Sequence, residues 1–317
     1  MSNIKLQFQK AWDLINQADK IFLTTHEGTD GDDLGSLLAI KLALQKQNKQ
    51  ISACIKELIP SNLHFLPGLQ DISQNFIDQN YDLVIIFGCN KLERTGFDQL
   101  RAANCPIINF DHHPDNSNFG SVNIVDPNAA AVAELVYNFL KFGEVTIDKQ
   151  IATCLLTGIF TDTGGFKHAN TSPSALEAAA ALMKKGARIE KIASSTMTKH
   201  KPAAVRAWAK GLENTRFDPE KQMVFSALSE NDLEEIGATP DDMEGFVEML
   251  NNIPQAKFAL FLRQEGDVVK GSLRSEPHKG VDVSKIARTL GGGGHKLAAG
   301  FKIKGRLTKD RDLWKIV

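Results

Sequence analysis

The chain has 317 residues, which at about 150 residues per domain predicts two domains. Hydrophobic residues make up 42% of the chain and charged residues 24%, and these ordinary globular values exclude a disordered protein or a fibre. The 37 Lys and Arg residues against 38 Asp and Glu residues leave a net charge of −1, which excludes binding of long nucleic acids through bulk positive charge. No apolar run approaches the roughly 18 residues of a membrane span and no N-terminal signal core is present, so we expect a soluble, cytoplasmic protein.

The first half of the chain alternates strand and helix patterns. Short apolar runs bounded by polar residues predict strands at 20–25, 51–55, 83–87 and 107–110. Helical patterns lie at 34–47, 129–142, 147–160 and 172–185, and the last begins with Ser172 and Pro173, which are typical of a helix start. Apolar strands separated by helices favour a parallel sheet with flanking helices.

The pattern changes after residue 186. Residues 187–213 have a polar helical pattern, which predicts a helical linker. Strand patterns at 223–229, 258–264 and 268–274, interleaved with two short helices, then predict a smaller mixed domain. We therefore predict an α/β protein with an N-terminal parallel-sheet domain over 1–186, a helical linker over 187–213 and a smaller mixed α/β C-terminal domain over 214–317.

Four clusters of polar or glycine residues stand where predicted elements run into loops. They are His26, Asp30 and Asp32 after the first strand, Asp111, His112 and His113 after the strand at 107–110, Asp162 at the end of a helix, and the four glycines at 291–294 with His295. The carboxyl ends of strands in an open α/β sheet bind ligands, and imidazole and carboxylate groups there can converge on a metal ion. Bare glycine amides can approach a phosphate closely. Taken singly, each cluster has a plain alternative: an acidic turn, a solvated loop, a helix end or a flexible loop.

Together, the ordered motifs HxxxDxD, DHH, TDTGGF and GGGGHKLAAG closely resemble those of the DHH phosphoesterase family with its glycine-rich, DHH-associated C-terminal domain. The resemblance covers nearly the whole chain. Its length and domain order are those of the bacterial branch that hydrolyses very short oligoribonucleotides (nano-RNA) and the bisphosphate pAp. The resemblance thus implies a metal-dependent phosphoesterase in which hydroxide, activated by two Mn²⁺ ions, attacks phosphorus in line.

The resemblance also implies roles for individual residues. One ion would be held by His26 and Asp30, and the other by Asp32, His112 and Asp162. His113 would face the scissile phosphate, and Asp111 would orient a histidine. The residues implied in substrate binding are Arg274, Gly292, Gly293, Gly294 and His295.

These roles imply a short oligonucleotide, a dinucleotide or pAp as the partner, because a site closed between two domains accepts one or two nucleotides but not a long strand. The motif GGGGH and Arg274 argue against an inorganic pyrophosphatase, and the lack of extra binding domains argues against a long-strand exonuclease. Whether two chains associate as a homodimer is left open by the sequence.

One position departs from the family pattern. The family's third strand typically ends in an aspartate that bridges both metals, and here that position is Gly88. Asp33 could shift the coordination so that two metals still bind, with Asn90 or Cys89 as weaker substitutes. Alternatively, the protein works with one metal, or it is a catalytically impaired homologue that binds nucleotides without hydrolysing them. The other ligands are all intact, which favours an active enzyme.

Overall fold

The computed structural model describes residues 3–76, 80–102, 104–196, 201–310 and 313–317. It divides into two compact units, Met1–Thr198 and Lys199–Val317, which we describe separately. The segment predicted as a linker contains two helices: α6 (Ile189–Thr196) contacts α4 in the first unit, and α7 (Pro202–Glu213) contacts α8 and β8 in the second. The stretch 197–200 between them lies outside the described residues, and the boundaries at 186 and 213 stay predictions.

The first unit contains a six-stranded sheet in which every neighbouring pair is parallel, as the sequence predicted. The strand order is β3-β2-β1-β4-β5-β6. The strands are β1 (Lys20–Thr25), β2 (Gln50–Cys54), β3 (Ile72–Ser73), β4 (Leu83–Phe87), β5 (Ile107–Asp111) and β6 (Val122–Val125). Four of them match the predicted strands closely, whereas β3 and β6 were not predicted.

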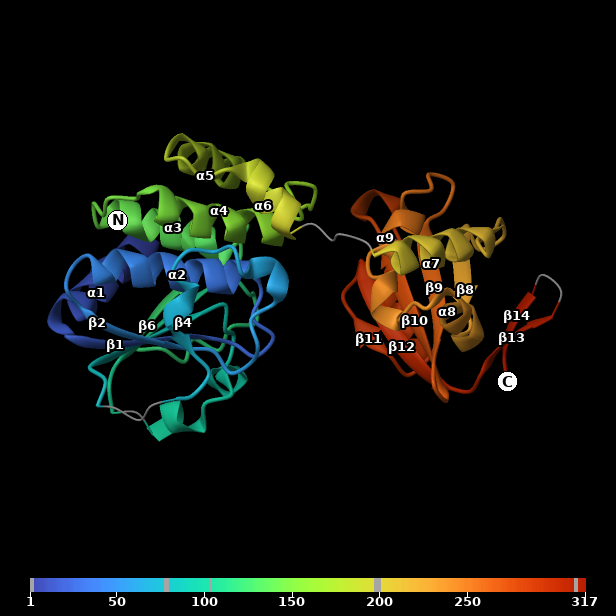
Figure 1. The fold of residues 1–317 in the computed structure, drawn as a ribbon, viewed down its shortest axis with the longest axis horizontal. Helices are drawn as coiled ribbons and strands as arrows, with labels where there is room; N and C mark the ends of the chain where they lie inside the picture. The colour runs from blue at the N-terminus through green and yellow to red at the C-terminus, as the bar shows by residue number, and fades with distance from the viewer. Residues whose placement is uncertain (1–2, 77–79, 103, 197–200, 311–312) are drawn as a thin grey trace. The chain divides into compact units, whose positions relative to one another are not determined.

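Helices cover one face of this sheet (Figure 1), and the 3₁₀ helices η3 and η4 pack against the other. Successive strand residues point to opposite faces, so Ile21 and Leu23 of β1 belong to the helix-side core and Phe22 to the opposite core. The elements are α1 (Asn3–Gln17), α2 (Gly31–Gln45), α3 (Val132–Phe142), α4 (Lys149–Asp162), α5 (Pro173–Lys184), η1 (Ser61–Leu63), η2 (Leu69–Asp71), η3 (Leu92–Thr95) and η4 (Asp98–Ala102).

Helices α2 and α4 pack very closely and run antiparallel. A Cβ atom on Gly35 of α2 would lie 2.4 Å from the carbonyl oxygen of Cys154, and one on Gly31 would lie 2.6 Å from Oγ1 of Thr161. Only glycine allows two backbones to approach in this way. The first turn of α2 therefore lies beside the last turn of α4, where Asp162 ends the helix.

The second unit combines helices and strands, as predicted, and contains a six-stranded sheet with the order β11-β12-β10-β9-β8-β7. Strands β8 and β9 are parallel, and the other neighbours are antiparallel. Its elements are β7 (Arg216–Asp218), β8 (Met223–Leu228), β9 (Phe258–Glu265), β10 (Val268–Ser275), β11 (Gly293–Gly294), β12 (Ala298–Lys304), α8 (Glu230–Ile236), α9 (Phe246–Asn251), α10 (Val283–Thr289), η5 (Pro240–Met243) and η6 (Pro277–Lys279). A separate hairpin joins β13 (Leu307–Asp310) to β14 (Leu313–Ile316). Among the described helices of the chain, none is long and apolar enough to cross a membrane.

Candidate metal centre

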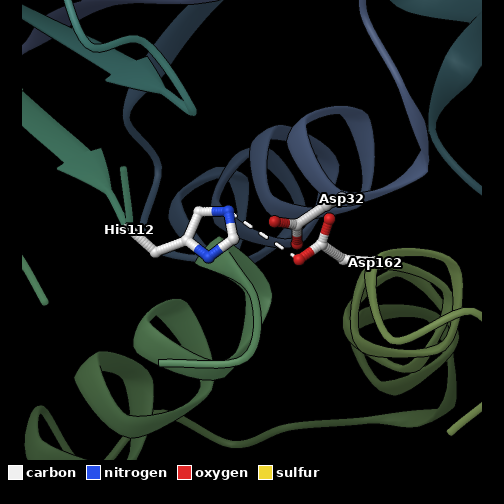
Figure 2. Close-up of side chains that lie close together, drawn as sticks. All are labelled: Asp32, His112 and Asp162. Carbon is white, nitrogen blue, oxygen red and sulfur yellow. Dashed lines mark ion pairs between the residues drawn. The ribbon is translucent and has the colours of Figure 1, made fainter. Parts of the chain in front are cut away.

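Three side chains from separate segments converge at the carboxyl end of the parallel sheet (Figure 2). Asp32 lies in the first turn of α2, His112 directly follows β5, and Asp162 ends α4. One ligand atom from each lies within 4.8 Å of the others, and Nε2 of His112 is 3.8 Å from Oδ2 of Asp162. An imidazole and two carboxylates are a donor set that suits a divalent transition metal.

Backbone groups orient two of these three side chains. Nδ1 of His112 lies 3.2 Å from the carbonyl oxygen of Ala129, so it donates its proton there and leaves Nε2 with a lone pair towards Asp162. The two carboxylate oxygens of Asp32 accept hydrogen bonds from the backbone amides of Val132 (2.6 Å) and Ala133 (2.8 Å), at the amino end of α3. The helix therefore fixes the position of a buried carboxylate beside the histidine.

The carboxylates of this region are crowded and buried. Burial raises the pKa of Asp32 well above its ordinary value, and the charges of Asp162, Asp33 and Asp30 raise it further. Burial also raises the pKa of Asp162, although the neighbouring His112 opposes the shift. A bound cation would stabilise the ionised form of these groups, so the donor set and its charge both fit a metal ion.

Asp30 and His26 take different positions near this group. Oδ1 of Asp30 accepts hydrogen bonds from the amides of Asp32 (2.8 Å) and Asp33 (3.1 Å), which makes Asp30 the N-cap of α2. Nε2 of His26 lies 2.6 Å from Oδ2 of Asp33, and this contact raises the pKa of His26 to about 9. Burial and the charge of Asp30 raise the pKa of Asp33 to about 6, although His26 pulls it down. A shared metal role for His26 and Asp30 stays a prediction.

The motif residues Asp111 and His113 form a pair. Nδ1 of His113 lies 2.7 Å from Oδ1 of Asp111, and the amide of Asn116 donates to the other oxygen at 2.5 Å. Asp111 is completely buried, whereas 40% of the His113 side chain is exposed. The contact with Asp111 raises the pKa of His113. The pair therefore consists of a fixed internal carboxylate and an accessible imidazole.

Gly88 has the left-handed φ of +64°, and a Cβ atom there would lie only 1.6 Å from Oδ1 of Asp33. The sequence offered Asp33, Cys89 and Asn90 as substitutes for a carboxylate at position 88. Of these three, Asp33 is the residue whose side chain lies directly beside Gly88. The thiol of Cys89 donates to the carbonyl of Lys91 and packs in the core on the side of the sheet away from the α-helices. The amide of Asn90 donates to Asp115.

Arg94 was missed by the sequence analysis. Its guanidinium lies 3.4 Å from Nδ1 of His26 and donates to Oδ1 of Asn90 at 3.2 Å. It lies on η3, in a polar loop without a motif, so nothing in the local sequence pointed to it. The positive charge of Arg94 opposes the rise in the pKa of His26 that Asp33 causes.

The predicted substrate-binding residues of the second unit gather at one end of its sheet. Arg274 on β10 is paired in register with Ala298 on β12, and Ala298 closes a tight turn with His295 through reciprocal backbone hydrogen bonds. The guanidinium of Arg274 donates to Glu248 at 2.6 Å, and His295 is exposed. A Cβ on Gly292 would lie 2.1 Å from the carbonyl oxygen of Gly300, so the glycine loop lies directly on β12.

Fold and motifs together define a two-domain hydrolase. Residues 20–159 match the model of the DHH family, N-terminal domain, and residues 220–314 match the model of the DHHA1 domain. The chain belongs to the DHH family of phosphoesterases, and it is an enzyme. Family membership implies dependence on divalent metal ions, and Asp32, His112 and Asp162 form a group that could hold one.

Several known proteins are similar over nearly the full length. The bifunctional oligoribonuclease and PAP phosphatase NrnA of Thermus thermophilus is 32% identical over 289 residues, which cover 90% of this chain and 84% of that protein. The protein of the same description from Mycoplasma genitalium is 28% identical over 92% of this chain and 91% of its own length. An exopolyphosphatase-related protein from Bacteroides fragilis has a crystal structure that matches with a TM-score of 0.83 and 26% identity, over 97% of this chain and 93% of that one.

Proposed function

We propose that this protein is a manganese-dependent hydrolase of short nucleotides, which removes mononucleotides from oligonucleotides of two to five residues, dephosphorylates pAp, or does both. The observation that carries the proposal is the convergence of Asp32, His112 and Asp162 within 4.8 Å of one another. The substrates are suggested by relatives described as oligoribonuclease and PAP phosphatase. The main alternative, an impaired homologue, is not favoured, because Asp33 supplies a carboxylate where Gly88 lacks one.

In this proposal the metal ions and the protein side chains have different roles. Asp32, His112 and Asp162 would hold one divalent ion, and His26 and Asp30, in the segment between β1 and α2, would hold the second. Such ions, when bound, supply an activated water and polarise the phosphoryl oxygens. Manganese is our choice because it accepts a mixed shell of imidazole and carboxylate.

His113 and Asp111 supply the proton chemistry in this proposal. Because Nδ1 of His113 donates to the buried Asp111, its Nε2 is the atom that can face a phosphate or the departing oxygen. Asp111 is held by Asn116 and keeps the ring in one orientation, as the carboxylate of a catalytic pair does. A protonated His113 can neutralise charge on the phosphate and donate its proton to the leaving group.

The second unit would recognise the rest of the nucleotide. Arg274 can grip a phosphate with two parallel hydrogen bonds, in competition with its present partner Glu248. The amides of Gly292, Gly293 and Gly294, together with His295, would contact a terminal phosphate or a base. In this division of labour, residues 1–186 form the catalytic domain, 187–213 link the domains and 214–317 bind substrate.

Product analysis tests the proposal directly. The purified protein, incubated with Mn²⁺, is given a 5′-phosphorylated dinucleotide or pAp, and the products are separated by ion-exchange chromatography. We expect mononucleotides from the first substrate, or AMP and inorganic phosphate from the second, and no product after chelation. The variant Asp162→Asn should be inactive, and Asp98→Asn, which changes an exposed carboxylate on η4, should match the wild type. Hydrolysis of neither substrate by the metal-loaded protein would overturn the proposal.

A further inference from the structure

Asp33 is a buried carboxylate that the motifs do not account for. Its side chain is 4% exposed, and its Oδ2 forms an ion pair with Nε2 of His26 at 2.6 Å. Buried carboxylate oxygens are normally paired, because losing water without gaining a partner is costly. Asp33 is therefore as buried as a core residue, although its side chain is a carboxylate of the kind that binds metal ions.

The backbone at residue 88 leaves room for the carboxylate of Asp33. Oδ1 of Asp33 lies 1.6 Å from the place where a Cβ of residue 88 would stand, so no residue except glycine fits beside it. Gly88 also has φ of +64°, and its amide donates to the carbonyl of Phe110 at 2.8 Å, which keeps this end of β4 in the sheet. The carboxylate of Asp33 therefore occupies the end of β4 that a side chain from residue 88 would otherwise fill.

Asp33 also lies between the group formed by Asp32, His112 and Asp162 and the side chain of His26. Adjacent residues of a helix point about 100° apart, so Asp32 reaches α3 while Asp33 reaches β4 and His26. Asp33 directly follows Asp32 in the first turn of α2, so the two carboxylates start from neighbouring positions of the same helix. On its other side, Oδ2 stands 2.6 Å from Nε2 of His26.

We infer that Asp33 is a metal-ligating carboxylate, which together with His26 completes a second divalent-cation position beside the Asp32 group, and that Gly88 exists to make room for it. Oδ2 of Asp33 and Nε2 of His26, which form an ion pair at 2.6 Å, are an oxygen and a nitrogen donor that could both bind one divalent ion once His26 loses its proton and the two atoms move apart. This inference deepens the proposed function and rests on it for the identity of the metal. The competing explanation is a purely structural His26–Asp33 ion pair.

The test measures metal binding rather than hydrolysis. The full-length protein is titrated with Mn²⁺ alone, and free Mn²⁺ is followed by its electron paramagnetic resonance signal. We expect the wild type to bind two ions and Asp33→Asn, which keeps the shape of the side chain, to bind the second at least 10-fold more weakly. Asp98→Asn is the matched control and should bind like the wild type, because its carboxylate is exposed on η4. Two ions bound by Asp33→Asn with wild-type affinity, or one ion in both proteins, would overturn the inference.

A relocation variant tests the role of Gly88. In the double variant Asp33→Ala/Gly88→Asp the carboxylate starts from β4 instead of α2 but reaches the same space. Aspartate tolerates a positive φ better than most residues, so the variant should fold. We expect it to regain the second Mn²⁺, whereas Asp33→Ala alone does not. A folded double variant that still lacks the second ion would contradict the assignment of Gly88.

The two proposals fail separately. A protein that binds two Mn²⁺ ions through Asp33 but hydrolyses neither a dinucleotide nor pAp would overturn the proposed function and leave the metal position standing. If the protein hydrolyses these substrates and its Asp33→Asn variant binds Mn²⁺ with wild-type affinity, the metal position is overturned and the proposed function stands.

Discussion

Asp111 is completely buried at the end of β5, and its Oδ1 holds Nδ1 of the half-exposed His113 at 2.7 Å. The second oxygen is taken by Asn116, so the carboxylate cannot turn away from the histidine. A fixed internal carboxylate gives the ring one orientation and leaves Nε2 directed outward. The pair therefore separates the positioning residue, Asp111, from the group that would meet the phosphate.

The first prediction concerns His113. His113→Ala should lower kcat by about 100-fold or more, because general acid catalysis typically contributes that much. Its Mn²⁺ stoichiometry should stay that of the wild type, since His113 is not among the proposed ligands. Asp111→Asn should lower kcat by about 10- to 100-fold, as expected for loss of a residue that orients another. Steady-state kinetics and metal titration on the same samples check this, and His64→Ala, at an exposed histidine, is the control. Loss of bound metal in His113→Ala would show that the residue is a ligand instead.

The second prediction concerns the stability of the metal-free protein. Asp32 and Asp162 are forced together with Asp33 in a buried region, so the ionised carboxylates repel one another when no cation is present. We expect Mn²⁺ to raise the melting temperature of the wild type. Asp162→Asn should melt higher than the wild type in chelator and gain less from Mn²⁺. Calorimetric scans with and without metal measure both effects. A variant that is less stable than the wild type in chelator would mean that Asp162 serves the fold.

Much of the fold was predictable because its strands have a local signal. β1 and β4 are short apolar runs bounded by polar residues, and their predicted limits agree with the structure. β3 has two residues, too few to show any periodicity, and β6 lies within a polar loop. Such strands are held by pairing with their neighbours rather than by their own sequence.

The site was predictable only where residues form motifs. The structure brings together Asp32, His112 and Asp162, which the family resemblance had assigned to one ion. The contact of Asp33 with Gly88 could be raised only as one of several explanations, because it depends on how the start of α2 meets the end of β4. Arg94 gave no signal at all, since its role arises from η3 folding back towards His26.

The third prediction is a pH dependence of stability at Asp82. One oxygen of Asp82 accepts hydrogen bonds from the amides of Lys20 (2.8 Å) and Asp19 (3.0 Å), which ties the start of β4 to the start of β1. The bond from Lys20, and then that from Asp19, lower the pKa of this carboxyl. A lowered folded-state pKa means that the stabilisation is fully present above the ordinary value of about 3.9 and is lost as the pH falls through the folded-state value.

Asp82→Asn should therefore melt lower than the wild type at pH 7, and the difference should close as the pH falls below about 3.9. Melting temperatures measured across this range check the prediction. Asp98→Asn serves again as the control, because the side chain of Asp98 is exposed and its ion pair with Arg101 is long, at 3.7 Å. A difference between Asp82→Asn and the wild type that stays constant with pH would show that the charge of Asp82 plays no part.

The fourth prediction concerns the close packing of α2 on α4. In an unconstrained helix, replacing glycine by alanine would stabilise by roughly 0.5–1 kcal/mol. At Gly35, however, the new Cβ would lie 2.4 Å from the carbonyl oxygen of Cys154, which is backbone and cannot rotate aside. Gly35→Ala should therefore destabilise the first unit by about 1–3 kcal/mol, the usual cost of overpacking.

The same substitution should weaken metal binding. If α2 moves away from α4, Asp32 is displaced from both Asp162 and the amides of α3 that hold it. We expect Gly35→Ala to lower the unfolding midpoint in denaturant and to bind Mn²⁺ more weakly even at temperatures where it is folded. Gln45→Ala, at an exposed position of α2, should change stability by less than about 0.5 kcal/mol and leave binding unaltered. Normal Mn²⁺ affinity in a destabilised Gly35→Ala would mean that the position of Asp32 does not depend on this helix contact.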